Sequence, residues 1–375
     1  MYPNATGTYY GGSFLKERNR FLSPYFTSIY VIRPVPVGKY FFLNYTHDGN
    51  VHVFFPMFFH LPLESLRRRL GFRYFTLIDS IVVRNNWNVD IIHAHTVYPS
   101  GLAGILMGKK YKKPVVLTVH GSDIHTFPFQ GKWQRKVTEV TLRSADAIIA
   151  VSTYLKDIII NELELKDLRN KIFVIPNGVD TEKFRIMNRV EARKQLELPL
   201  NRKIVLNVAN LVPVKNQEIL IREFAKVVEE IPDSILYIVG KGPLKRKLEN
   251  VIEAENLQGK VILVGARPHD EIPLWMNASD VFVLPSKNEG FPTVVVEALA
   301  TGTPVVISSN VRAATDVIIN KLNGYIVEGE EYSSYIVKSF FKEWNRSIIR
   351  KGVAKFSWDN WRENIEQVYL SLGGI

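Results

Sequence analysis

The chain contains no cysteine among its 375 residues. A disulfide framework and a thiolate metal site are therefore excluded, and a reducing compartment is compatible with the sequence. No apolar run approaches the ~18 residues that a membrane-spanning helix needs, and the N-terminus lacks the apolar core of a signal peptide. Internal repeats and low-complexity segments are also missing. We therefore expect a globular cytoplasmic protein, for which peripheral attachment to the inner membrane face stays open.

The residues that are present give an ordinary composition with a basic charge. Hydrophobic residues make up 46% and charged residues 23%, and the length allows two domains that each have their own core. The formal net charge of +11 suits anionic small molecules, an anionic membrane surface or nucleic acid. A surface excess that only improves solubility explains the charge equally well. Net charge is the weakest reason to expect nucleic acid, and we predict no such partner.

Apolar strand-like runs alternate with helical segments along most of the chain, which is typical of an α/β protein with parallel sheets. A polar, charged stretch over residues 181–202 separates two such series, and a new strand follows at 203–208. This change in composition predicts a domain boundary near residue 182. In open α/β sheets ligands bind outside the carboxyl ends of the strands, so residues that follow strands are the first candidates for a site.

The segment 284–304, LPSKNEGFPTVVVEALATGTP, has the features of an anion site. It predicts a helix from about Pro292, where a missing N–H has no cost, and Glu297 is the only ionisable group of that helix. A carboxylate among apolar neighbours needs a partner. Glu289 lies eight residues earlier, at the positive end of the helix dipole. We expect backbone N–H groups for an anion at the helix start, which comprises Gly290, Phe291, Pro292 and Thr293.

Histidines stand at the ends of two predicted strands in the first half of the chain. His93 and His95 share one face of a strand and could ligate a metal, but no third ligand is evident. A polar strand end that lines a cleft is the favoured interpretation. His120, in VHGSDI, follows the apolar run 114–119 and lies at a carboxyl strand end, so we expect it in the site. A purely structural histidine is the alternative.

The motif around Glu289 and Glu297, NEGFPTVVVEALATGTPVV, resembles the E-x7-E signature of retaining, nucleotide-sugar-dependent glycosyltransferases of the family 4 type. The resemblance covers nearly the whole chain and implies the α/β GT-B fold, with two Rossmann-like, doubly wound domains facing each other across a cleft. It implies an N-terminal domain over residues 1–182, completed by the C-terminal helix 357–375, and a donor-binding domain over 183–356. The family's opening strand is not evident before residue 2. The alternative is a Rossmann-like helix in which Glu297 is merely salt-bridged to a Lys or Arg.

The same resemblance assigns roles to residues outside this motif. Gly11 and Gly12 are similar to a glycine-bearing loop that faces the donor phosphates, and Lys215 matches a phosphate-binding lysine. Relatives carry an arginine where this chain has Asn210, so one cationic contact is missing unless Arg267 or another residue supplies it. A second departure lies in residues 312–316, where relatives have glycines and a glutamate.

The resemblance implies transfer of a sugar from a nucleotide-diphosphate donor, UDP- or GDP-linked, to the hydroxyl of a sugar or lipid-linked glycan acceptor. Glu289 would hold sugar hydroxyls, Glu297 ribose hydroxyls and His120 the transferred sugar. Lys215 would neutralise the leaving diphosphate. No D-x-D sequence occurs, so we predict metal independence and no tightly bound cofactor. A sugar-nucleotide epimerase, a phosphorylase and a non-catalytic scaffold on the same fold are the alternatives.

The segment 54–77, FFPMFFHLPLESLRRRLGFRYFTL, leaves two interpretations open. Aromatic residues interleaved with Arg67, Arg68, Arg69 and Arg73 are typical of an element at a membrane surface. A helix that packs on the sheet, with its arginines in solvent, is slightly favoured.

Overall fold

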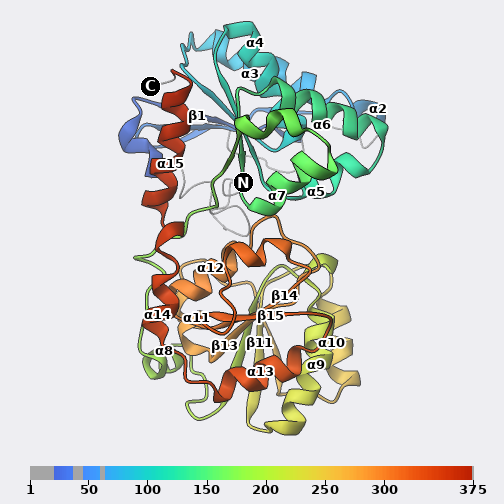
Figure 1. The fold of residues 1–375 in the computed structure, drawn as a ribbon, viewed down its shortest axis with the longest axis vertical. Coiled ribbons are helices and arrows are strands. Elements are labelled where there is room, and N and C mark those ends of the chain that lie inside the picture. Colours follow the sequence, from blue (N-terminus) through green and yellow to red (C-terminus); the bar gives the residue numbers. More distant parts are fainter. Residues whose placement is uncertain (1–20, 37–44, 60–63, 374–375) are drawn as a thin grey trace. The chain divides into compact units, whose positions relative to one another are not determined.

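The computed structural model describes residues 21–36, 45–59 and 64–373. The chain divides into two compact units, which Figure 1 shows as a ribbon. Unit 1 comprises residues 1–177 and 359–375, and unit 2 comprises residues 178–358. The sequence predicted that the chain passes from one domain to the other at 182/183 and back at 356/357, a few residues from these boundaries.

The described strands of unit 1 form separate hydrogen-bonded sheets. The largest is parallel, in the order β6-β7-β8-β9, and all five residues of its strand β7 are buried, as expected for a parallel strand covered on both faces. A second sheet has the order β1-β4-β3, and β2 pairs with β5. The strands are β1 (Ile29–Ile32), β2 (Val35–Pro36), β3 (Tyr45–Asp48), β4 (Val51–Phe54), β5 (Met57–Phe58), β6 (Ile92–His95), β7 (Val115–Val119), β8 (Ala147–Ala150) and β9 (Ile172–Val174).

Helices surround the parallel sheet of unit 1, and the last helix of the chain belongs with them (Figure 1). They are α2 (Glu64–Arg67), α3 (Leu70–Arg84), α4 (Leu102–Tyr111), α5 (Ser122–His125), α6 (Lys132–Ser144), α7 (Thr153–Asp157) and α15 (Trp358–Ser371). Helix α3 packs on α4: a Cβ added at Gly71 would lie 2.7 Å from the Leu102 side chain. The helix expected within the segment 54–77 therefore packs on helix α4, whereas the sequence interpretation had it packing on the sheet.

Unit 2 is built on a six-stranded parallel sheet in the order β12-β11-β10-β13-β14-β15. Strand β10, the first of this unit in chain order, lies in the middle, with β11 on one side and β13 on the other. This order is that of a doubly wound nucleotide-binding sheet, and its switch point lies between β10 and β13. The strands are β10 (Lys203–Val208), β11 (Ser234–Val239), β12 (Val261–Gly265), β13 (Val281–Leu284), β14 (Val305–Ser308) and β15 (Gly324–Val327).

Two groups of helices cover this sheet (Figure 1). One group packs its apolar residues with the sheet into a core and comprises α9 (Gln217–Glu230), α10 (Lys245–Ala254) and α13 (Tyr332–Phe341). The other comprises α8 (Arg189–Gln195), α11 (Ile272–Ala278), α12 (Thr293–Ala300) and α14 (Arg346–Lys351). Within the described residues, none of the helices is long and apolar enough to cross a bilayer.

Candidate active site

The loops that follow β10 and β13 meet at the carboxyl edge of the unit 2 sheet, which is the switch point of its strand order. The N–H of Lys287 donates to the carbonyl of Val214 at 2.8 Å and so ties the two loops together. The turn after β11 supports them from the other side. There, a Cβ added at Gly240 would lie 1.9 Å from the carbonyl oxygen of Ala209, so only glycine allows the turn to approach this closely.

Lys215 and Glu289, one from each loop, form an ion pair. Lys215 Nζ lies 2.5 Å from Glu289 Oε1, and their side chains are 21% and 16% exposed. Lys215 ends a short 3₁₀ turn, Pro213–Lys215, in the loop after β10. The predicted phosphate-binding cation and the predicted sugar-binding carboxylate are therefore in contact. Both remain partly accessible, so an incoming anion can bind the ammonium group while hydroxyl groups donate to the carboxylate.

Glu297 on α12 has a histidine as its partner, and not the Lys or Arg of the alternative interpretation. His269 Nε2 lies 2.9 Å from Glu297 Oε1, and Lys183 Nζ lies 3.0 Å from the other ring nitrogen, Nδ1. A lysine ammonium only donates hydrogen bonds, so Nδ1 accepts and Nε2–H donates to the carboxylate. This arrangement fixes the imidazole tautomer and holds the Glu297 carboxylate in one orientation.

Sequence reasoning missed His269 and Lys183. His269 follows β12 in an exposed turn that carries no motif, and Lys183 lies where the sequence indicated only a domain boundary. The one available signal was position, since residues after a parallel strand lie at the ligand-binding edge.

The start of α12 differs from the prediction. The helix begins at Thr293, and Pro292 occupies the N-cap position with φ −82° and ψ 69°. The N–H of Thr293 donates to the carbonyl of Phe291 at 3.0 Å, and Pro292 has no N–H. The expectation of a free N–H donor at every residue of the turn therefore does not hold at Pro292 and Thr293, and the cation Lys215 is the nearby group that remains for an anion. The cause is a tight turn at Phe291-Pro292, in which the Thr293 N–H already donates to a backbone carbonyl of the turn.

Of the four other predicted phosphate-binding residues, two have partners other than Lys215 and Glu289, and two lie outside the described residues. Asn210 is exposed, and its carbonyl accepts from the Gln217 side chain at 3.0 Å. The side chain of Arg267 is 43% exposed, with Nε 4.0 Å from a carboxylate oxygen of Glu271. Gly11 and Gly12 lie outside the described residues.

In unit 1, the loop that carries His120 is organised by a buried carboxylate. Asp123 Oδ1 accepts from the backbone N–H groups of His120 at 3.0 Å and Gly121 at 2.8 Å, and Oδ2 accepts from Val97 at 3.2 Å. Burial raises the pKa of Asp123 and these N–H donors oppose that rise. His120 Nε2 lies 2.8 Å from His95 Nδ1. The expected site histidine is thus held in place at the end of β7.

The other histidine of the predicted pair faces the end of the chain. His93 Nδ1 lies 2.5 Å from the Tyr369 hydroxyl, and His93 Nε2 lies 2.6 Å from Thr118 Oγ1. Its ring nitrogens therefore serve structural hydrogen bonds. Among the described residues, no group of His, Asp and Glu side chains is arranged to hold a metal ion.

Comparison with known proteins identifies the family. Residues 188–340 match the model of the glycosyl transferases group 1, and residues 44–183 match that of glycosyltransferase family 4. A glycosyltransferase of uncharacterised specificity from Methanocaldococcus jannaschii is 30% identical over 294 residues, which are 76% of either chain. The chain belongs to this glycosyltransferase family.

Two other relatives of this glycosyltransferase have names that state an activity or a pathway. A UDP-Gal:alpha-D-GlcNAc-diphosphoundecaprenol alpha-1,3-galactosyltransferase of Escherichia coli is 34% identical over 66% of this chain and 64% of its own. The putative teichuronic acid biosynthesis glycosyltransferase TuaC of Bacillus subtilis is 35% identical over 58% of this chain, and the match spans about half, 52%, of its length.

Solved structures establish the fold of the glycosyltransferase as GT-B, with two Rossmann-like domains. Sucrose-phosphate synthase from Thermosynechococcus elongatus has a TM-score of 0.77 at 21% identity, covering 97% of this chain and 94% of its own. Anabaena HepE in complex with UDP and glucose has a TM-score of 0.74 at 22% identity and covers 96% of both chains. The predicted family and fold class are confirmed.

Proposed function

We propose that this glycosyltransferase binds a nucleotide-diphosphate sugar at the switch point of unit 2 and transfers the sugar to an acceptor hydroxyl with retention of configuration. The observation that carries the proposal is the contact of Lys215 with Glu289 between the loops after β10 and β13, followed by Glu297 eight residues later. The cation suits the diphosphate of the donor, and the two carboxylates suit the hydroxyls of the sugar and of the ribose on either side of it.

Each residue has a distinct role in this proposal. Lys215 and the start of α12 bind the diphosphate, where negative charge develops as the donor bond breaks. Glu289 accepts hydrogen bonds from hydroxyls of the transferred sugar, and Glu297 accepts them from the ribose. His120, at the carboxyl end of β7, keeps the role that the family resemblance gives it, a contact of the transferred sugar. Donor binding thus replaces the internal ion pair of Lys215 and Glu289 with two contacts to the ligand.

The reaction breaks the bond between the anomeric carbon and the diphosphate oxygen. The acceptor oxygen forms its new bond on the same face of the sugar, and its proton passes to the leaving phosphate oxygen. The E-x7-E motif is the reason to expect retention. No step requires a metal ion in this scheme, because Lys215 and the start of α12 neutralise the negative charge of the leaving diphosphate.

The donor and acceptor classes follow from the relatives. A UDP-sugar is favoured, because the HepE structures contain UDP and the E. coli relative uses UDP-galactose; a GDP-sugar is the next candidate. The acceptor is a sugar or a lipid-linked glycan, as the diphosphoundecaprenol substrate of that relative suggests. We place the reaction in the synthesis of a polysaccharide, glycolipid or other glycoconjugate.

The test is a panel of UDP-, GDP- and ADP-sugars, scored by thermal stabilisation and by donor turnover. A bound donor raises the unfolding temperature by mass action. Glu289→Gln and Lys215→Ala should each lower kcat/KM by roughly 10²–10³-fold, the effect of losing one stabilising contact at the leaving group. Lys194→Ala, which removes an exposed charge on α8, is the control.

Two results would overturn the proposal. If no donor of the panel stabilises the protein or is turned over, the donor site is wrong. If NMR of the product shows inverted anomeric configuration, the retaining mechanism is wrong although the donor site stands.

A further inference from the structure

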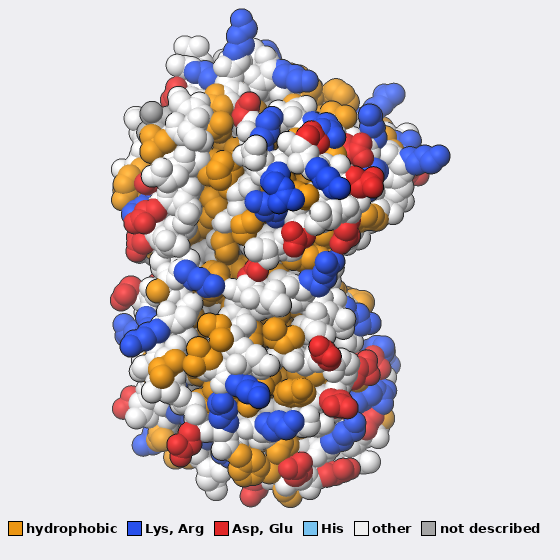
Figure 2. Space-filling model, viewed as in Figure 1, with side chains coloured by type: hydrophobic (Ala, Val, Ile, Leu, Met, Phe, Trp, Pro, Cys, Tyr) orange, Lys and Arg blue, Asp and Glu red, His pale blue; other side chains and the backbone are white. Residues whose placement is uncertain are grey.

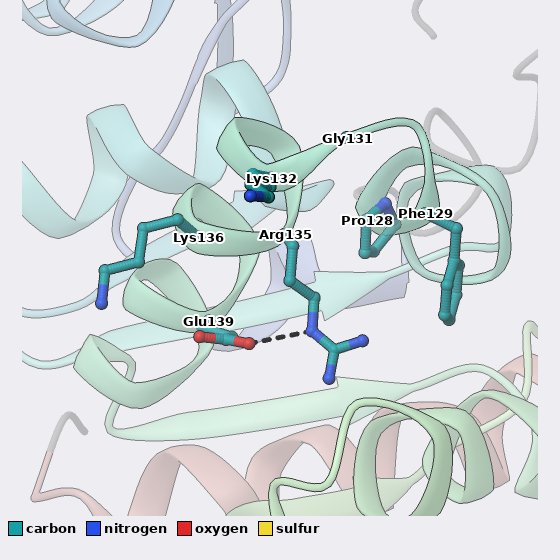
Figure 3. A pocket seen from close by; sticks show the side chains of 7 residues that line it. All are labelled: Pro128, Phe129, Gly131, Lys132, Arg135, Lys136 and Glu139. Atoms are coloured by element: carbon teal, nitrogen blue, oxygen red, sulfur yellow. Dashed lines mark hydrogen bonds and ion pairs between the residues drawn. The ribbon is translucent and has the colours of Figure 1, made fainter.

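Two arginines on helix α14 of unit 2, Arg346 and Arg350, differ from the other basic side chains in their partners. Lysine and arginine side chains usually project into solvent, and Figure 2 shows them spread over the surface of both units. An arginine that turns inward usually pairs with a carboxylate, as Arg135 of unit 1 does with Glu139 at 2.8 Å in Figure 3. Arg346 and Arg350 are partly buried, and the acceptors that they have among the described residues are neutral oxygens.

Both arginines bind the carboxyl end of α12, the helix of the proposed donor site. The last carbonyls of a helix have no partner within it. Arg350 Nη1 donates to the carbonyl of Ala300 at 2.5 Å, and Arg346 Nη2 donates to that of Thr301 at 2.8 Å. Cations at this end also offset the negative end of the helix dipole. The close approach requires glycine at Gly302, where φ is +71° and an added Cβ would lie 2.7 Å from Arg346 Cβ.

The same two arginines also bind the segment that leads from β9 to α8. Arg350 donates through Nη1 to the carbonyl of Phe184 at 2.6 Å and through Nη2 to that of Thr181 at 2.7 Å. Arg346 Nη1 donates to the carbonyl of Met187 at 2.9 Å, further along the segment. Each guanidinium therefore joins the end of α12 to a different part of this segment.

The part that Arg350 holds carries the groups that orient His269. Lys183 Nζ lies 3.0 Å from His269 Nδ1, and the buried ring of Phe184 lies 5.3 Å from the imidazole. His269 Nε2 in turn donates to Glu297 on α12 at 2.9 Å. Arg350 thus binds both ends of one chain of contacts, the segment with Lys183 and the helix with Glu297. The contacts form a closed circuit.

We propose that Arg350 is a positioning residue of the donor site, which keeps His269 bonded to Glu297 by holding the segment before α8 against the end of α12. Its effect on the reaction rests on the proposed function, in which Glu297 binds the ribose. Without the guanidinium, three carbonyls lose a donor, the segment separates from α12, and Lys183 no longer fixes the imidazole tautomer. Arg346 binds further from Lys183, so it stabilises the same elements without this role.

The direct test is ¹⁵N NMR of the histidine ring nitrogens in the full chain without any ligand. In the wild type His269 should show two well-separated signals, because Nδ1 accepts a hydrogen bond and Nε2 carries the proton. In Arg350→Ala these signals should move toward each other as the two tautomers mix. His269→Gln assigns them. Because no nucleotide is present, this result does not depend on the proposed function.

The consequence for the site is measured as the Kd of UDP. Arg350→Ala should raise it about ten-fold, the loss expected for one hydrogen bond to a charged group. For 2′,3′-dideoxy-UDP, which lacks the ribose hydroxyls, the same substitution should raise Kd by less than about two-fold. Arg350→Lys keeps the charge without the planar fork, so it should recover part of the UDP affinity and of the signal separation.

Arg346→Ala is the matched control, because it removes the same side chain and the same kind of contacts from the same helix. It should lower the unfolding temperature but leave the His269 signals unchanged, and Arg135→Ala in unit 1 should also leave them unchanged. If Arg350→Ala does not fold, Arg350→Lys carries the test, with a smaller shift of the signals.

An unchanged His269 spectrum in a folded Arg350 variant, or an equal change in Arg346→Ala, would overturn the inference. Equal losses of affinity for UDP and its dideoxy analogue would also overturn it, because the effect would then not pass through the ribose contact. A shifted His269 spectrum in a protein that binds neither UDP nor GDP would uphold the hold of Arg350 on His269 and overturn the proposed function alone.

Discussion

At the scale of single residues, the orientation of Glu297 is determined by a neighbour that carries no motif. His269 donates to the carboxylate through Nε2 because Lys183 occupies Nδ1. The Glu297 side chain is only 13% exposed, so water can solvate its negative charge only in part. The carboxylate therefore needs a hydrogen-bond donor from the protein. The signature carboxylate is thus supported by a second layer of hydrogen bonds, which the spacing of the two glutamates does not reveal.

We therefore predict that His269→Ala weakens donor binding more than it slows transfer. A ribose contact is equally strong in the ground state and the transition state, so KM for the donor should rise about ten-fold with kcat nearly unchanged. His269→Gln keeps an N–H donor and should recover part of the loss. Initial rates over a range of donor concentrations measure both constants.

Asp270→Asn is the matched control, because it alters the adjacent residue and leaves the His269 ring in place. Asp270 pairs with Lys183 but its side chain is 89% exposed, and exposed ion pairs contribute little. KM should stay within about two-fold of the wild-type value. A fall in kcat with unchanged KM in His269→Ala would contradict the assigned role.

At the scale of elements, the sequence predicted what depends on local pattern. The strand predicted over residues 203–208 is β10, residue for residue. The spacing of Glu289 and Glu297 placed both residues around the start of α12. The contacts of these glutamates could not be predicted, because Lys215 and His269 are 74 and 28 residues away from them and meet them only through the strand order. The sequence also did not reveal the tight turn at Pro292, whose backbone conformation places the start of α12 at Thr293.

A buried carboxylate links two helices of unit 2 and makes their packing sensitive to acid. Glu223 on α9 accepts from the backbone N–H of Ser333 at 3.1 Å and from its hydroxyl at 2.9 Å, in the first turn of α13. Burial alone would raise the pKa of Glu223, but the hydrogen bonds from Lys226 and Ser333 outweigh burial and lower it below its ordinary value of 4.5. The ionised form therefore serves as a cap for α13.

Because this pKa is lowered by folding, the contribution of Glu223 to stability is present above pH 4.5 and is lost as the pH falls through the folded-state pKa. Glu223→Gln should lower the free energy of unfolding by about 1–2 kcal/mol at neutral pH. The difference from the wild type should shrink in acid. Denaturant titrations at several pH values measure it, and Glu230→Gln, at an exposed position of the same helix, should show no such difference. A difference that stays constant down to pH 3 would rule out the charge as its origin.

At the scale of the whole molecule, the two units differ in how the chain builds them. Unit 2 is one continuous stretch, whereas unit 1 needs residues 359–375 to return to it. The two crossings of the chain run side by side: the N–H of Val179 donates to the carbonyl of Phe356 at 2.7 Å, and a Cβ added at Gly178 would lie 2.4 Å from the Trp358 ring. Helix α15 then reaches β6 and the start of the described chain through Tyr369.

This discontinuity predicts that damage to α15 destabilises unit 1 and spares unit 2. Tyr369 is 3% exposed, its ring lies 5.9 Å from Phe26, and its hydroxyl bonds to His93, whereas its neighbour Leu370 is 53% exposed. Tyr369→Ala should therefore lower the stability of unit 1 by about 3–5 kcal/mol, the usual effect of deleting a buried aromatic ring, and Leu370→Ala by less than about 0.5 kcal/mol.

Hydrogen exchange followed by mass spectrometry measures the two units separately. In Tyr369→Ala it should quicken in β1, β4 and β6 while the strands from β10 to β15 keep their protection, because the core of unit 2 contains no part of α15 beyond Trp358. Equal acceleration in β10 and β13 would show that the two units unfold as one.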